Sequence, residues 1–261
     1  MVSRRSRGVS VGVNLNPNNA CNWACSYCQV PDLTLGRAPE IDIPRLDREL
    51  RGLLEEIVRG DWMIRRAPEG SRRLNDVALS GNGEPTTSPQ FADAVETVGA
   101  ALRDFTLIGE LTPLLITTGS QIGRPAVDGG LVELAQLGGE VWFKLDSATA
   151  EGARRICGRP VDPERHLERL RRSAELCPTW IQTCVFALDG KPPSEAEQQA
   201  YLAAVRQLVR EGTPLRGVKL YGLARPSLQP GADRLTALPA EWLEAFTREV
   251  ESCGVTVETS V

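Results

Sequence analysis

The sequence predicts an α/β fold, an open partial barrel of six strand–helix units. Six short apolar stretches alternate with six stretches whose apolar residues recur at helical spacing. No obvious linker splits the chain, so we expect one domain over residues 1–261, with a core of about 10–226 and a C-terminal helix and edge strand within 239–261. Six units are fewer than the eight of a closed barrel, which favours a partial (β/α)6 barrel with a parallel sheet.

Strands are expected at the short apolar stretches, which cover residues 10–15, 76–80, 113–118, 141–146, 180–188 and 217–223, with a last edge strand over 255–261. In the first stretch Val11 and Val13 alternate with Gly12, Asn14 and Asn16. Successive side chains of a strand point to opposite faces. The apolar set therefore suits the helix layer, and the polar set is expected to line the barrel interior.

Helices are expected over residues 44–59, 90–104, 127–138, 163–176, 194–211 and 240–252. Leu46, Leu50 and Leu54 show the helical spacing in the first of these. Ser194 with Glu197 three residues later predicts a capping box at the start of the fifth.

Composition excludes several classes of protein. With 41% hydrophobic and 25% charged residues, the chain is not disordered, collagen-like or coiled-coil. No run of 18 apolar residues and no apolar leader is present, so we expect a cytoplasmic protein without a membrane partner. A net charge of −4 argues against unspecific nucleic-acid binding. The odd number of cysteines, seven, favours a reducing compartment over a disulfide framework.

Three of the cysteines crowd into one loop after the first strand. Cys21, Cys25 and Cys28 follow the pattern C-x3-C-x2-C. Three thiolates can hold three corners of a [4Fe–4S] cluster, which leaves one iron open for another ligand. The alternatives are a structural zinc site and accidental clustering. His166, the only histidine, is far away in sequence and is expected on a solvated helix surface.

A glycine-rich segment, Gly81-Asn82-Gly83-Glu84, ends the second strand. Glycines let the backbone approach a ligand closely, and the Glu84 carboxylate could hold a ligand ammonium group. The alternative is an ordinary turn.

Together these two motifs resemble the radical S-adenosylmethionine (SAM) superfamily. Tyr27 before the last cysteine matches its cluster motif, and Gly81–Glu84 resembles its glycine-glycine-glutamate motif, with Asn82 inserted. The resemblance implies a [4Fe–4S] cluster on the three cysteines, whose open iron chelates SAM. It also implies an external electron donor of the flavodoxin or ferredoxin type, and a 5′-deoxyadenosyl radical that abstracts hydrogen from an unidentified substrate.

Segments 3–5, 117–120, 144–147 and 224–226 are similar to the wyosine-synthase-like iron–sulfur oxidoreductases. Wyosine synthases modify a guanosine in transfer RNA and carry a second cluster. Cys157, Cys177, Cys184 and Cys253 are too widely spread for a second local triad. A transfer-RNA-modifying enzyme is therefore kept as an alternative, and a non-catalytic iron–sulfur electron carrier as another.

The resemblance suggests further contacts with SAM. Tyr27 would lie near the adenine, or is simply a packed aromatic residue. Thr117, Thr118 and Lys144 are candidates for contacts with the ribose or the carboxylate, and Gln182 for the ribose hydroxyls. For Lys144 the alternative is a structural ion pair with a nearby carboxylate, Asp146 or Glu84.

Other polar residues have smaller expected roles. Asn14 and Asn16 are expected to hold the cysteine loop by side-chain-to-backbone hydrogen bonds. Cys157, between arginines, is considered as a reactive thiol, with a buried inert thiol as the alternative for such residues. Arg225 is expected at the rim of the active site, where it would contact an anionic substrate. The N-terminal arginines at positions 4, 5 and 7 are expected to make no direct contact with the substrate.

Overall fold

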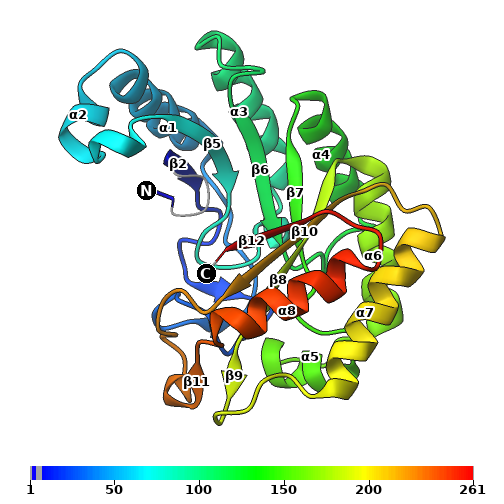
Figure 1. The fold of residues 1–261 in the computed structure, drawn as a ribbon. Coiled ribbons are helices and arrows are strands. Elements are labelled where there is room, and N and C mark those ends of the chain that lie inside the picture. The colour runs from blue at the N-terminus through cyan, green and yellow to red at the C-terminus, as the bar shows by residue number, and fades with distance from the viewer. Residues whose placement is uncertain (1, 4–7, 261) are drawn as a thin grey trace.

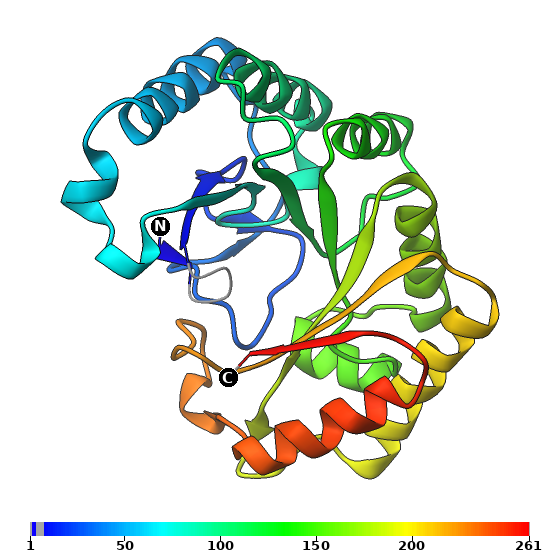
Figure 2. The same ribbon diagram turned by 45° about the horizontal axis from the view of Figure 1, so that its top comes forward.

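A computed structural model describes residues 2–3 and 8–260 as a curled sheet with helices on its outside (Figure 1). The sheet has eight strands in the order β1 (Val2–Ser3), β2 (Gly8–Val13), β5 (Leu74–Leu79), β6 (Thr112–Thr117), β7 (Glu140–Lys144), β8 (Thr179–Val185), β10 (Leu215–Gly222) and β12 (Val257–Ser260). Strand β1 is antiparallel to β2, and all the other pairings are parallel. The two edges, β1 and β12, do not pair, so the barrel stays open (Figure 2). The predicted partial barrel and its edge strand are confirmed.

The six predicted helices are present as α1 (Ile43–Val58), α3 (Phe91–Asp104), α4 (Pro125–Gln136), α6 (Pro163–Leu176), α7 (Glu195–Arg210) and α8 (Ala240–Glu251). The capping box of Ser194 and Glu197 starts α7 as predicted. No helix within the described residues is both long enough and apolar enough to cross a bilayer.

Several short elements were not predicted from the sequence patterns. These are the helices α2 (Trp62–Arg66) and α5 (Ala150–Cys157), the single 3-10 turns η1 (Glu69–Ser71), η2 (Pro85–Thr87) and η3 (Ala232–Arg234), and the two-stranded pairs β3 (Ala20–Cys21) with β4 (Thr34–Leu35) and β9 (Ala187–Leu188) with β11 (Leu235–Thr236). The predicted strand 180–188 is therefore too long, because its last residues leave the main sheet to pair with β11.

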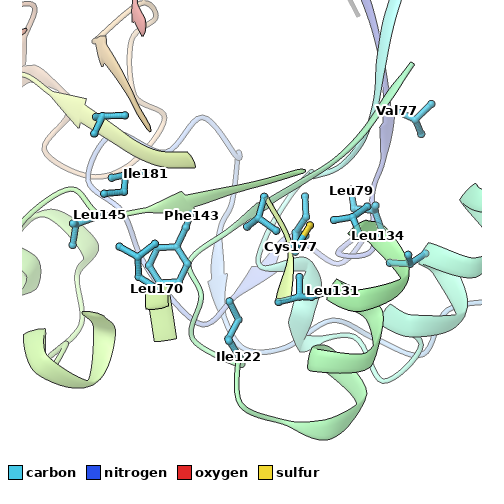
Figure 3. Packing of buried hydrophobic residues seen from close by; sticks show 14 of the residues in the cluster. Val77, Leu79, Ile122, Leu131, Leu134, Phe143, Leu145, Leu170, Cys177 and Ile181 are labelled. Carbon is cyan, nitrogen blue, oxygen red and sulfur yellow. The ribbon is translucent and has the colours of Figure 1, made fainter. Parts of the chain in front are cut away.

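The hydrophobic core lies between the sheet and the outer helices. Figure 3 shows Phe143 and Leu145 at β7, Ile181 on β8 and Leu170 on α6 packed together, and all four are buried. Full burial of such a side chain contributes about 1.5–3 kcal/mol. Because these residues alternate with polar ones along the strands, the opposite face of the sheet carries the polar groups.

The parallel strands end at one edge of the sheet, which we call the carboxyl edge. The loops after β2, β5, β6, β7, β8 and β10 all begin there. Active sites of barrels lie at this edge.

Candidate active site

The loop between β2 and α1 carries the three clustered cysteines at the carboxyl edge. Cys21 is buried, whereas Cys25 and Cys28 are half-buried, and none of the three forms a disulfide. Burial raises the pKa of Cys21 to about 12 and also raises the pKa of Cys28 above its usual 9.0. Thiolates at these positions would therefore need the positive charge of a metal centre, and binding it would release protons.

The donor set fits an iron–sulfur cubane better than a zinc ion. Within residues 2–3 and 8–260 no three His, Cys, Asp or Glu side chains converge on the position of a single metal ion. Structural zinc needs four ligands around one point. In a cubane each thiolate binds a different iron, so three free thiols spread along one loop meet its requirement.

The C-terminal end of α5 holds the cysteine loop from one side. Ala24 N donates to Cys157 O at 2.9 Å, and Ser26 N donates to Ile156 O at 2.8 Å. The Cys157 thiol is buried, and contact with the Cys25 thiol together with burial raises its pKa far above the usual value. These surroundings indicate an inert thiol. They do not support the reactive thiol that the neighbouring arginines suggested in the sequence.

The loop after β10 holds the cysteine loop from the other side. Ser227 Oγ donates to Ser26 O at 2.7 Å and lies 3.2 Å from Cys28 O. Gln229 Nε2 donates to Val30 O at 2.7 Å. No sequence pattern indicated Ser227 or Gln229, because their partners are remote in the chain.

The glycine loop packs directly on the start of the cysteine loop. A Cβ atom on Gly81 would overlap Asn14 Oδ1, and one on Gly83 would overlap Ala20 O. The backbone N–H of Asn82 donates to Asn14 Oδ1 at 3.1 Å. The two motifs recognised in the sequence therefore lie against each other, and only glycine fits at either contact.

Asn14 and Asn16 hold the cysteine loop as predicted. Asn16 Nδ2 donates to Ala20 O at 2.9 Å, and Asn14 Oδ1 accepts from Asn16 N at 3.0 Å. Two buried polar atoms beside these loops, Asn16 Oδ1 and Ser26 Oγ, have no partner in the part of the chain that the structure describes. Such atoms are uncommon in folded proteins, and a bound ligand could satisfy them.

Glu84 connects the glycine loop to the end of β6. Its side chain is buried, with 1% of the residue exposed. One carboxylate oxygen accepts from Thr117 Oγ1 at 2.6 Å and from both the N–H and the hydroxyl of Thr86. The other accepts from Thr118 N at 2.5 Å. Thr117 and Thr118, predicted as ligand contacts, thus position the Glu84 carboxylate.

A charged network occupies the interior face of the sheet. Tyr27 Oη donates to Asp146 Oδ2 at 2.5 Å, and Lys144 Nζ lies 3.9 Å from the same oxygen and 3.3 Å from Tyr221 Oη. Burial is the largest single effect and disfavours the Lys144 ammonium, but Asp146 together with Tyr221 and two cysteine thiols outweighs it and raises the pKa of Lys144 above its usual value. The predicted alternative for Lys144, an ion pair with Asp146, is present. The sequence patterns did not indicate Tyr221 as a site residue. It stands two residues after Lys219 on β10, so the two side chains lie on the same face of that strand.

Gln182 and Tyr27 lie beside this network. Gln182 is buried on β8, in register with Lys144 on β7, so both side chains belong to the interior face. The Tyr27 ring packs against Phe186, with ring centroids 5.7 Å apart.

His166 is not on a solvated surface, and that prediction is wrong. Only 3% of the residue is exposed, and its ring lies 4.8 Å from the Phe143 ring and 5.6 Å from the Trp23 ring. Nε2 donates to Lys144 O at 2.8 Å, and burial lowers the pKa of His166 to about 4. His166 stands four residues before the buried Leu170, a spacing that places both on the inner face of α6.

Arg225 is exposed in the loop after β10, at the carboxyl edge. The N-terminal arginines Arg4, Arg5 and Arg7 lie outside the described residues.

Comparisons with known proteins agree with this geometry. The family model of the radical SAM superfamily matches residues 15–200. A structure of TYW1 with a bound lysine–pyruvate adduct is 14% identical, and the match covers 92% of this chain and 73% of that one with a TM-score of 0.57. A radical SAM methyltransferase from Sphaerobacter thermophilus is 15% identical, with 97% and 66% covered and a TM-score of 0.64. No curated protein matches by sequence. At these identities the two structures share the fold.

Proposed function

This chain belongs to the radical SAM superfamily, and on that premise we propose that Cys21, Cys25 and Cys28 hold its cluster and that it abstracts hydrogen from an anionic substrate. Members of the superfamily are enzymes that use a [4Fe–4S] cluster and SAM and need an external electron donor. When bound, the cluster supplies the electron that splits SAM into methionine and a 5′-deoxyadenosyl radical. We propose a donor of the flavodoxin or ferredoxin type, a cytoplasmic location and an oxidoreductase activity.

One observation carries the proposal: three free thiols share one loop at the carboxyl edge, and the glycine loop packs directly on it. An electron carrier would not need the glycine loop or an open iron, and family membership does not favour that alternative. The transfer-RNA alternative lacks a second clustered set of cysteines.

Glu84 is proposed to accept a hydrogen bond from the SAM ammonium. Its oxygen Oε2 has one donor, Thr118 N, among the described residues, so a lone pair is left for a ligand. The backbone of Gly81, Asn82 and Gly83 would lie along the same ligand, because the loop is held close to the cysteines.

Lys144, Gln182 and Tyr27 are proposed to contact the remaining parts of SAM. The Lys144 ammonium suits a carboxylate, and the Gln182 amide suits the ribose hydroxyls. Tyr27, already packed against Phe186, would present its ring to the adenine. Arg225 is exposed at the carboxyl edge and is cationic, which favours an anionic substrate.

Loss of the cluster cysteines tests the proposal. Anaerobically purified protein should hold about four iron atoms per chain, and after reduction it should release 5′-deoxyadenosine from SAM. Replacing any one of Cys21, Cys25 and Cys28 by Ala should remove both properties. Cys253→Ala is the control, since Cys253 is a buried cysteine outside the loop that donates to Leu202 O at 3.7 Å. Iron retained in the loop variants, or about eight iron atoms in the parent protein, would contradict the assignment.

A further inference from the structure

A cavity of about 520 Å³ lies between the loop that follows β6 and the start of α6. Charged groups dominate its lining, which includes Arg124, Arg165, Arg169, Arg172, Glu168 and Ser120. We call it the arginine cavity. None of its arginines belongs to the site described above.

Only part of the positive charge in the arginine cavity is neutralised by ion pairs among the described residues. Arg172 pairs with Asp128 at 3.2 Å and with Glu175 at 3.5 Å. Arg124, Arg165 and Arg169 have no ion pair with any residue of the described chain. Burial and the guanidinium groups of Arg165 and Arg124 lower the pKa of Arg169, and the nearby Glu168 carboxylate, which raises it, does not offset them.

This arrangement breaks two local rules of helix stability. Arg165 lies in the first turn of α6, where the helix dipole disfavours a cation. It also precedes Arg169 by four residues, a spacing at which like charges destabilise a helix. Elsewhere the chain follows the rule, since Arg45 pairs with Glu49 four residues away. Glu164 in the first turn and Glu168 beside Arg169 offset this conflict in part. A local conflict that is not fully compensated is typical of a functional site.

The position of the cavity connects it to the active site. It lies at the carboxyl edge, because the loop after β6 begins there and α6 starts on that side. Ser120 in its wall accepts a hydrogen bond from Asn22 Nδ2 at 2.6 Å. Asn22 directly follows Cys21, so the cavity and the cysteine loop share a wall.

We propose that the arginine cavity binds a phosphate group. Guanidinium groups bind phosphate oxygens through paired hydrogen bonds, and a phosphate dianion would offset the repulsion among three arginines. The volume lies within the range of ligand sites that accept small molecules. The phosphate would belong to a phosphorylated small molecule or to a nucleic-acid backbone. This inference goes beyond the proposed function and does not depend on it.

The first test measures thermal unfolding of the full chain in potassium phosphate and in potassium chloride at equal ionic strength. Phosphate should raise the melting temperature of the parent protein in a saturable way. The double variant Arg165→Gln/Arg169→Gln should lose this rise. In chloride the double variant should melt at the same or a higher temperature, since like charges have been removed. Arg210→Gln, which removes an exposed arginine at the end of α7, is the control and should keep the full response.

The second test identifies the source of the phosphate by titrating adenosine monophosphate and a ten-nucleotide single-stranded RNA. Removal of two charge-assisted contacts should weaken the preferred ligand by about tenfold or more. If RNA is preferred, the negative slope of log affinity against log salt should become less steep by about 1.4 in the double variant. Equal responses of the parent and the double variant to phosphate, nucleotide and RNA would overturn the proposal. A double variant that melts lower in chloride would also overturn it, because the arginines would then be structural.

Discussion

At the scale of single residues, Glu84 has two tasks that can be separated by experiment. Its carboxylate accepts hydrogen bonds from Thr86, Thr117 and Thr118, and we propose that it also accepts from SAM. In Glu84→Gln an uncharged amide would face these donors. Loss of a charged hydrogen bond costs about 1.5–3 kcal/mol. We expect a lower free energy of unfolding in urea and about tenfold weaker SAM binding by calorimetry.

Thr117→Val is the matched control for this change. It removes the hydroxyl that donates to Glu84 and accepts from Gly119 N, but it leaves the carboxylate charge in place. The variant should lose stability by roughly 1–3 kcal/mol, with little change in SAM affinity. Unchanged SAM affinity in Glu84→Gln would move the ammonium site elsewhere.

At the scale of elements, the C-terminal end of α5 determines the position of the cysteine loop. Gly158 has φ +66°, and a Cβ atom there would lie 2.5 Å from Ala24 O. Gly158→Ala should therefore displace the loop and lower the iron content after anaerobic purification. Gly212→Ala provides the comparison, because its φ is +72° but no atom lies within 4 Å of the added Cβ. Both variants should carry the cost of a left-handed Ala, about 1–2 kcal/mol, and Gly158→Ala alone should lose iron. Equal iron content in the two variants would show that α5 does not position the cysteine loop.

At the scale of the whole molecule, His166 makes stability depend on pH. The pKa of His166 is lowered by burial from 6.5 to about 4. Between these values the unfolded chain binds a proton that the folded chain does not, so stability falls as the pH falls from about 6.5 to about 4. The full effect amounts to about 3 kcal/mol.

His166→Gln separates this effect from the titration of carboxylates. Glutamine keeps a donor for Lys144 O but cannot titrate. The free energy of unfolding, measured at pH 7 and pH 4.5, should fall more steeply for the parent protein than for the variant. Parallel pH profiles would show that the histidine is not buried in its neutral form.

Local sequence patterns were sufficient to predict an element or a site wherever the interacting residues are close in the chain. Helix α6 covers the predicted residues 163–176, because apolar spacing and the cap at Asp162 act within single turns. The three cysteines lie within eight residues, so their spacing alone indicated a shared cluster. The domain assignment to residues 1–261 remains a prediction.

Contacts between remote segments could not be found in this way. Thr117 is 33 residues from Glu84, and Ser227 is 201 residues from Ser26, yet both pairs are hydrogen-bonded. His166 is buried because α6 turns its inner face toward Phe143 and Trp23. The spacing of the α6 arginines is visible in the sequence, but the loop that completes their cavity comes from the end of β6. Such contacts depend on how helices pack against the curled sheet, and hydrophobic burial drives that packing without specifying partners in the local sequence.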